Sequence, residues 1–176
     1  LQHYHSFHQD KSQLFDTHVW TSPASMWIMS GRIYEVLCSK YPEQREYFRK
    51  NYILLLDDLE ALDKFMRSLF TTSESFLVYH PAWSYLSRDY GLHQNFIEIE
   101  DKEPAPRELI KMVQDIKEQG YRVLFIQPHE MNPTINMITQ QTGLELKMID
   151  SLSSNYIVNL SNVALELNRS FMDSKR

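Results

Sequence analysis

The sequence has 176 residues, of which 43% are hydrophobic and 23% are charged, as in an ordinary globular protein of about one domain. This composition excludes an intrinsically disordered chain, and a net charge of −5 without a basic run argues against binding to nucleic acid. No apolar run approaches the roughly 20 residues of a membrane-spanning helix, and the single cysteine, Cys38, cannot form an intrachain disulfide. With only 4 glycines, the chain also lacks the glycine-rich loops that bind nucleotides.

The start of the chain is polar and shows no hydrophobic period, so we expect a loop or a frayed end over residues 1–17. His3, His5 and His8 lie within it. Histidine-rich stretches can bind metal ions loosely, and an irregular tail explains the same residues equally well.

Two helices follow. Ser22 can cap the first one, Pro23 suits its first position, and it should end before Pro42. The second should run from Pro42 to Leu69, about 40 Å, with an apolar stripe that repeats over three heptads. Such a helix could be a coiled-coil partner, a rigid spine between two lobes, or a long helix on a core. We favour packing on a core, and the length suggests a spine.

From residue 76 onward, short apolar segments alternate with helical ones. The predicted strands are 76–79, 96–99, 121–126 and 144–149. The predicted helices are 81–90, 106–120, 133–143 and 156–173. Gly91, Gly120 and Gly143 stand where a helix passes into a strand, the usual place for a left-handed residue. This alternation predicts an α/β fold, with a four-stranded parallel sheet flanked by helices.

Polar side chains follow each predicted strand. His80 follows the first, Glu100 the second, Gln127 and His129 the third, and Asp150 the fourth. Ligands of parallel sheets bind beyond the carboxyl ends of the strands, and imidazole and carboxylate groups are ligands of zinc. His80 and Asp150 could therefore be metal ligands, although strand ends also carry polar residues simply because they meet water.

Five segments, in order along the chain, resemble motifs of bacterial metal-binding solute-binding proteins, the zinc- and manganese-uptake subunits of ATP-binding-cassette (ABC) transporters. The first is Asp-Thr-His-Val-Trp-Thr-Ser-Pro and the second is Val-Tyr-His-Pro-Ala-Trp-Ser-Tyr. The five segments are 16–23, 78–85, 98–106, 125–128 and 148–152.

The resemblance implies two α/β lobes joined by a long rigid helix, with the metal between the lobes. The chain would then divide into a remnant of the N-terminal lobe (1–41), the linking spine helix (42–70) and the C-terminal lobe (71–176). Because most of the first lobe would be missing, we expect at most three of the family's four metal ligands.

The resemblance also implies the ligands. His18 and His80 would supply imidazole nitrogens, and Asp150 would supply a carboxylate. Manganese-type members have Glu where His80 stands, so the nitrogen here favours Zn²⁺ over Mn²⁺. His129 and Glu130 replace less polar residues, and they could be extra ligands or simply exposed.

These observations predict a periplasmic or otherwise extracytoplasmic receptor of the bacterial cell envelope that delivers Zn²⁺ to the membrane permease of an ABC transporter. It would catalyse no reaction and bind no nucleic acid. We expect a monomer, and a chain without one lobe could self-associate. Two alternatives stay open: a zinc-dependent hydrolase on a doubly wound sheet, with Glu100 or Glu130 as its base, and a coiled-coil interaction or adhesion module.

Overall fold

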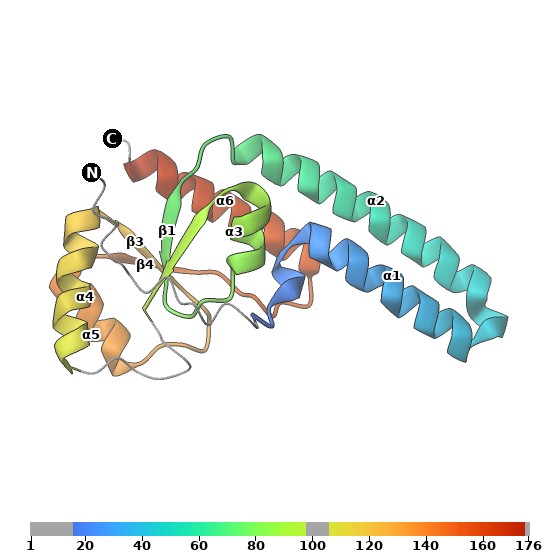
Figure 1. Ribbon diagram of the computed structural model, residues 1–176, viewed down its shortest axis with the longest axis horizontal. Coiled ribbons are helices and arrows are strands. Elements are labelled where there is room, and N and C mark those ends of the chain that lie inside the picture. The colour runs from blue at the N-terminus through green and yellow to red at the C-terminus, as the bar shows by residue number, and fades with distance from the viewer. Residues whose placement is uncertain (1–15, 98–105, 175–176) are drawn as a thin grey trace.

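The computed structural model describes residues 16–97 and 106–174, without the side chains of 106–108 and 174. An α/β body carries a hairpin of two long helices that extends away from it (Figure 1). The hairpin consists of α1 (Pro23–Lys40), a short 3₁₀ helix η3 (Pro42–Gln44) and α2 (Arg45–Leu69). The Ser22 side chain accepts a hydrogen bond from the Ser25 amide at 3.3 Å, so the predicted cap of the first helix is confirmed. None of the helices in these ranges is both long and apolar enough to cross a membrane.

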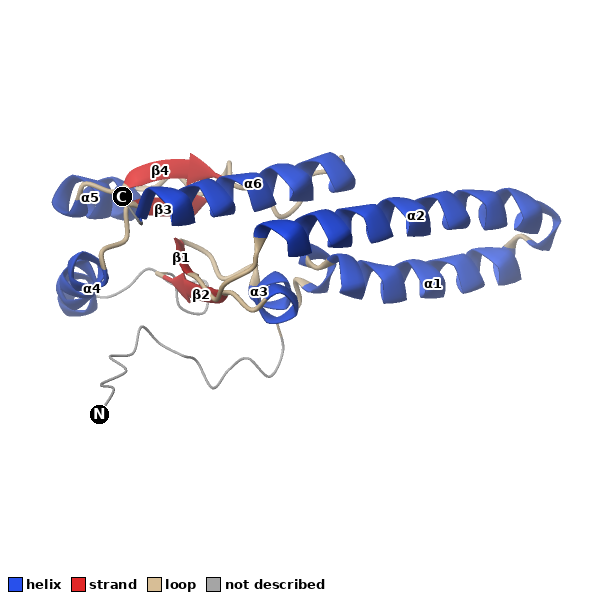
Figure 2. Ribbon diagram, turned by 90° about the horizontal axis from the view of Figure 1, so that it is seen from above, coloured by secondary structure: helices blue, strands red, loops and turns tan. Residues whose placement is uncertain are grey.

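The apolar stripe of α2 is used inside the chain. Near the tip of the hairpin, the ring of Tyr52 stacks on Tyr34 of α1 with 4.7 Å between ring centroids. Farther along, Leu59, Leu62 and Met66 are buried. Here α2 lies beside the last helix, α6 (Tyr156–Ser174) (Figure 2). The stripe therefore packs α2 against helices of its own chain, in agreement with packing on a core.

The α/β body contains the predicted four-stranded parallel sheet, in the order β2-β1-β3-β4. Its strands are β1 (Ser75–Val78), β2 (His93–Phe96), β3 (Val123–Ile126) and β4 (Glu145–Met148). Its remaining helices are α3 (Ser84–Tyr90), α4 (Pro106–Gln119) and α5 (Pro133–Thr142).

Each face of the sheet covers a separate hydrophobic core. Phe76 and Val78 of β1 point to one core, which also holds side chains of α2, α3 and α6. Leu77, between them, points to the other core, which it shares with side chains of α4 and α5. Alternation along β1 thus assigns its neighbouring residues to opposite layers, as a strand covered on both faces requires.

The second strand differs from the prediction. It was expected at 96–99, but β2 is His93–Phe96, and it pairs in parallel with Ser75–Val78. The helix α3 ends at Gly91, whose φ of 68° is left-handed, and the chain enters the sheet two residues later. Because β2 is an edge strand, it tolerates polar residues, and the apolar pattern alone placed it too late. Residues 98 and 99 lie outside the described ranges.

A partly buried polar contact fixes the start of α1 against α3. The hydroxyl of Ser22 donates a hydrogen bond to Asp89, which also accepts one from Arg88 Nε at 2.7 Å. Burial alone would raise the pKa of the Asp89 carboxyl, but the hydrogen bonds from Arg88 and Ser22 hold it below its usual value. The contact ties the segment that carries His18 to the body of the fold.

Candidate metal centre

The candidate site lies at the carboxyl edge of the sheet. From β1 the chain crosses to β2 on one side and then to β3 on the other, so the strand order reverses between β1 and β3. In open parallel sheets, ligands bind at this reversal. His80 follows β1 by two residues, Gln127 follows β3 directly, and Asp150 follows β4 by two residues. Three of the polar residues selected from the sequence thus end strands at this edge.

Two of the predicted ligands lie face to face. His18 and His80 are 62 residues apart in the sequence, and their Nε2 atoms are 3.3 Å apart. The ring planes are inclined at 78° with 5.1 Å between centroids. A tetrahedral zinc ion with bonds of about 2.0–2.1 Å places two ligand nitrogens about 3.3 Å apart. The separation of the pair is therefore the one that two imidazole ligands of a single zinc ion require.

A carboxylate behind His18 orients its ring. Asp16 Oδ1 accepts hydrogen bonds from His18 Nδ1 and from the His18 amide, both at 2.8 Å. With Nδ1 carrying the proton for this bond, Nε2 presents its lone pair towards His80. Asp16 Oδ2 is buried and has no hydrogen-bond partner among the described residues. Sequence reasoning gave Asp16 no role, although an Asp two residues before a candidate His was a usable signal.

The segment that carries His18 is hydrogen-bonded to the loop after β4 and to the start of α6. Trp20 Nε1 donates a hydrogen bond to the carbonyl of Ser151 at 2.7 Å. Tyr156 Oη donates to the carbonyl of Trp20 at 2.8 Å. Burial raises the pKa of the Tyr156 hydroxyl, so it remains a donor at any physiological pH. These contacts hold the His18 segment next to the loop that contains Asp150.

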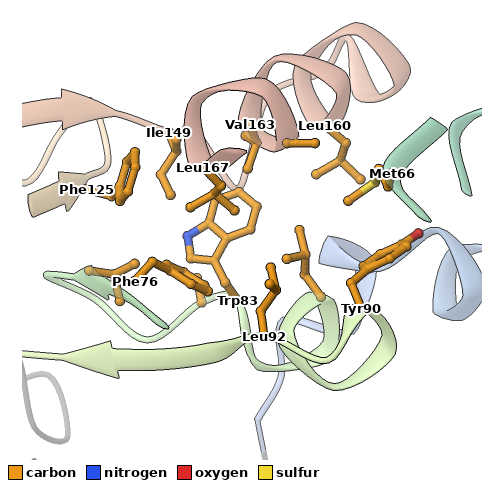
Figure 3. Close-up of a cluster of buried hydrophobic side chains, with 14 of the residues drawn as sticks. Met66, Phe76, Trp83, Tyr90, Leu92, Phe125, Ile149, Leu160, Val163 and Leu167 are labelled. Carbon is orange, nitrogen blue, oxygen red and sulfur yellow. The ribbon is translucent and has the colours of Figure 1, made fainter. Parts of the chain in front are cut away.

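His80 lies in a loop that is anchored by its neighbours. The helix predicted from residue 81 begins only at Ser84, because the Ala82 amide bonds to the His80 carbonyl at 2.9 Å instead. The Trp83 amide donates to Gln94 Oε1 at 2.7 Å. The indole of Trp83 is 1% exposed and sits between the sheet and α6 (Figure 3). A buried tryptophan three residues downstream thus limits the movement of His80.

Asp150 is half-buried, and its side chain accepts a hydrogen bond within its own loop. Oδ1 accepts a hydrogen bond from the Leu152 amide at 2.8 Å, and the Asp150 carbonyl accepts one from Asn159 Nδ2 at 2.7 Å. Within residues 16–97 and 106–174, no three or more His, Cys, Asp or Glu side chains form a group that could hold a metal ion. The structure brings His18 and His80 together without Asp150, so the three-ligand set stays a prediction.

Other predicted residues are placed differently. Gln127 and Glu130 bond to each other, and His129 is exposed on the same turn. Glu100 and the early histidines lie outside the described residues, as do Glu98, Asp101 and Glu103.

Known proteins resemble this chain in fold and in sequence. The sequence model of the family described as "Zinc-uptake complex component A periplasmic" (ZnuA) matches residues 1–169. The zinc-binding lipoprotein AdcA of Streptococcus pneumoniae serotype 4 is 29% identical over 144 residues, which are 80% of this chain and 29% of AdcA. The crystal structure of ZnuA has a TM-score of 0.84 at 26% identity, over 91% of this chain and 64% of that one.

A ZnuA deletion mutant with zinc bound gives a TM-score of 0.83 at 26% identity, over 92% of this chain and 63% of that one. This chain therefore spans less than two thirds of the length of these relatives. The match of the family model to most of the sequence, together with the shared fold, shows that the chain belongs to the ZnuA family of periplasmic zinc-uptake components.

Proposed function

We propose that this chain is part of an extracytoplasmic receptor that binds Zn²⁺ with His18, His80 and Asp150 and delivers it to the membrane permease of an ABC transporter. The observation that carries the proposal is the 3.3 Å separation between the Nε2 atoms of His18 and His80. Membership of a family described as a periplasmic zinc-uptake component supports it. We also propose the division into a lobe remnant (1–41), a spine helix (42–70) and a second lobe (71–176).

The receptor would act by selective binding alone. Two imidazole nitrogens and one carboxylate suit zinc better than manganese, which prefers oxygen ligands. His18 and His80 come from two segments that are 62 residues apart in the sequence. A movement that separated their two nitrogens would release the ion. No reacting group is needed for either step, so the proposed receptor is not an enzyme.

The two alternatives have less support. The family match gives no support to a hydrolase. A coiled-coil module would need the apolar stripe of α2 on its surface, but Leu59, Leu62 and Met66 in that stripe are buried within the chain.

Zinc binding can be tested on this chain directly. We expect one Zn²⁺ per chain in competition with a chromogenic chelator, and Mn²⁺ should bind more weakly, following the affinity order of divalent metals. The titration should use a variant in which His3, His5 and His8 are each replaced by Gln, so that only the proposed site is counted. Failure to compete for zinc, or tighter binding of manganese, would refute the proposal.

The carboxylate behind His18 should contribute to the affinity. Replacing Asp16 with Asn should weaken zinc binding by about 10–100-fold, the usual effect of losing a carboxylate that orients a ligating histidine. The amide is nearly the same size, but it cannot hold His18 with the same charge-assisted hydrogen bond. Chelator competition measures the change.

Asp57→Asn is the matched control for this variant, because Asp57 is exposed on α2, away from the sheet edge. It should bind zinc as the unmodified chain does. Equal affinities for the Asp16 and Asp57 variants would show that Asp16 does not act on the metal site.

A further inference from the structure

Gln127 carries a buried amide at the carboxyl end of β3, one of the two central strands of the sheet. The residue is 5% exposed, and a buried amide costs free energy unless its polar atoms form hydrogen bonds. Its Oε1 accepts hydrogen bonds from the Ser151 hydroxyl at 2.6 Å and from the Ser151 amide at 3.4 Å. Its Nε2 donates to Glu130 Oε1 at 3.3 Å. Both ends of the side-chain amide are therefore engaged.

The partners of Gln127 determine which way its amide points. The Ser151 backbone amide can only donate a hydrogen bond, and an ionised Glu130 carboxylate can only accept one. The oxygen of Gln127 therefore faces Ser151, and its nitrogen faces Glu130. A carboxylate at position 127 would meet Glu130 with a like charge, and a hydrocarbon chain would make neither contact. This junction requires an amide.

Ser151 continues the connection towards His18. Ser151 is 6% exposed, and its carbonyl accepts the hydrogen bond from Trp20 Nε1 at 2.7 Å. The ring of Trp20 in turn lies edge-on to the ring of His18, with 5.5 Å between centroids and 63° between planes. Trp20 is thus held by Ser151 at its indole nitrogen, and it packs against the imidazole that faces His80.

Ser151 also adjoins Asp150 in the sequence. The Asp150 carboxylate accepts its hydrogen bond from the Leu152 amide, so residues 150–152 form one short turn. A shift of Ser151 would displace this turn and Trp20 together. Ser151 is therefore the point at which the segments of two proposed ligands, His18 and Asp150, are set relative to each other.

We propose that Gln127 is a positioning residue of the metal centre, which fixes Ser151 and thereby sets His18 and Asp150 relative to each other. The inference rests on the function proposed above. In this role Gln127 does not touch the ion. Its hydrogen bonds hold the two segments in place before zinc arrives, so that less ordering is needed when the ion binds. Groups that orient metal ligands from behind contribute to affinity in this way.

The test begins with Gln127→Met, which keeps the length of the side chain and removes both hydrogen-bonding ends. Chelator competition, in the same background as the titration above, should show zinc binding weakened by about threefold to tenfold, the effect of losing one or two ordinary hydrogen bonds. The indole ¹H–¹⁵N resonance of Trp20, one of three tryptophans, should shift as well, because the Ser151 carbonyl that accepts its hydrogen bond moves.

Asn95→Leu is the matched control. It also removes a hydrogen-bonded amide, since Asn95 Nδ2 donates to Tyr121 Oη at 2.6 Å. Asn95 lies in β2, and Tyr121 precedes β3, so this contact is away from the loops that follow the strands. The control should change neither the zinc affinity nor the Trp20 resonance. Loss of stability alone would act on both variants alike, so the comparison separates positioning from a purely structural role.

A second variant, Ser151→Ala, removes the hydroxyl that Gln127 accepts from and keeps the carbonyl that binds Trp20. It should also weaken zinc binding and shift the Trp20 resonance. Combined with Gln127→Met, it should add little further loss, because both substitutions break the same contact. If Gln127→Met does not fold, Ser151→Ala and the Asn95 control carry the test.

Unchanged zinc affinity and an unchanged Trp20 resonance in Ser151→Ala and in any folded Gln127 variant would overturn this inference. So would losses that add fully in the double variant, or a loss of equal size in the Asn95 control. The proposed function would then still stand if the parent chain binds zinc and replacing His80 removes that binding. A parent chain that binds no zinc would overturn both.

Discussion

A His80→Ala variant should lose about a hundredfold to a thousandfold in zinc affinity. Zinc sites with four protein ligands contribute roughly 10–16 kcal/mol, which is roughly 3 kcal/mol for each ligand. Every 1.4 kcal/mol or so corresponds to a tenfold change in affinity. His18→Ala should have a similar effect, because the two Nε2 atoms lie 3.3 Å apart and would share one ion. Competition with a chromogenic chelator measures both losses.

His93→Ala is the matched control for this prediction. It removes an exposed imidazole from the opposite edge of the sheet and should leave the zinc affinity unchanged. The thermal stability of the His80 variant without zinc should stay close to that of the parent, since His80 is only half-buried. If zinc binds equally well to the His80 and His93 variants, the metal centre has been placed wrongly.

Much of the fold could be predicted because local signals and long-range packing agree. Gly91 and Gly143 end helices with φ values of 68° and 76°, a conformation that glycine adopts without strain. β3 is buried along its whole length, and its apolar sequence indicates this directly. At these positions, a single glycine or a short apolar run is enough to predict the local structure, whatever the distant residues are.

The sequence signal fails where tertiary contacts replace local preference. β2 has a polar sequence, and only its pairing with β1 makes it a strand. The start of α3 is delayed to Ser84 because the Ala82 amide bonds to the His80 carbonyl and the Trp83 amide bonds to Gln94 of β2, contacts that spacing cannot reveal. Both differences involve β2, whose pairing with β1 and hydrogen bond to Trp83 outweigh local propensity.

The candidate site could be predicted only in part. Their positions after predicted strands identify His80 and Asp150 as candidate metal ligands. Nothing in the spacing connects either of them with His18. The resemblance to a known family supplied that connection, and the structure places His18 and His80, but not Asp150, in contact at 3.3 Å. The sequence places Gln127 after a strand and Asp16 two residues before His18, but the roles of both depend on hydrogen bonds that only the fold determines.

Trp83→Ala should lower the free energy of unfolding by about 3–5 kcal/mol, the usual cost of removing a large aromatic side chain from a core. Its indole is 1% exposed and lies among Phe76, Leu160 and Leu167 (Figure 3). Small domains are stable by only about 5–15 kcal/mol, so the variant should be partly unfolded at moderate urea concentrations. Urea denaturation followed by circular dichroism measures the change.

Trp27→Ala gives the matched control, because the Trp27 side chain is 41% exposed on α1 and its removal should cost less than about 1 kcal/mol. The two variants should also differ in zinc affinity. Trp83 anchors the loop of His80, so its loss should weaken zinc binding as well, whereas the loss of Trp27 should not. If both variants unfold at the same urea concentration, the indole of Trp83 does not stabilise the packing of α6 on the sheet. The rigid placement of His80 would then need another cause.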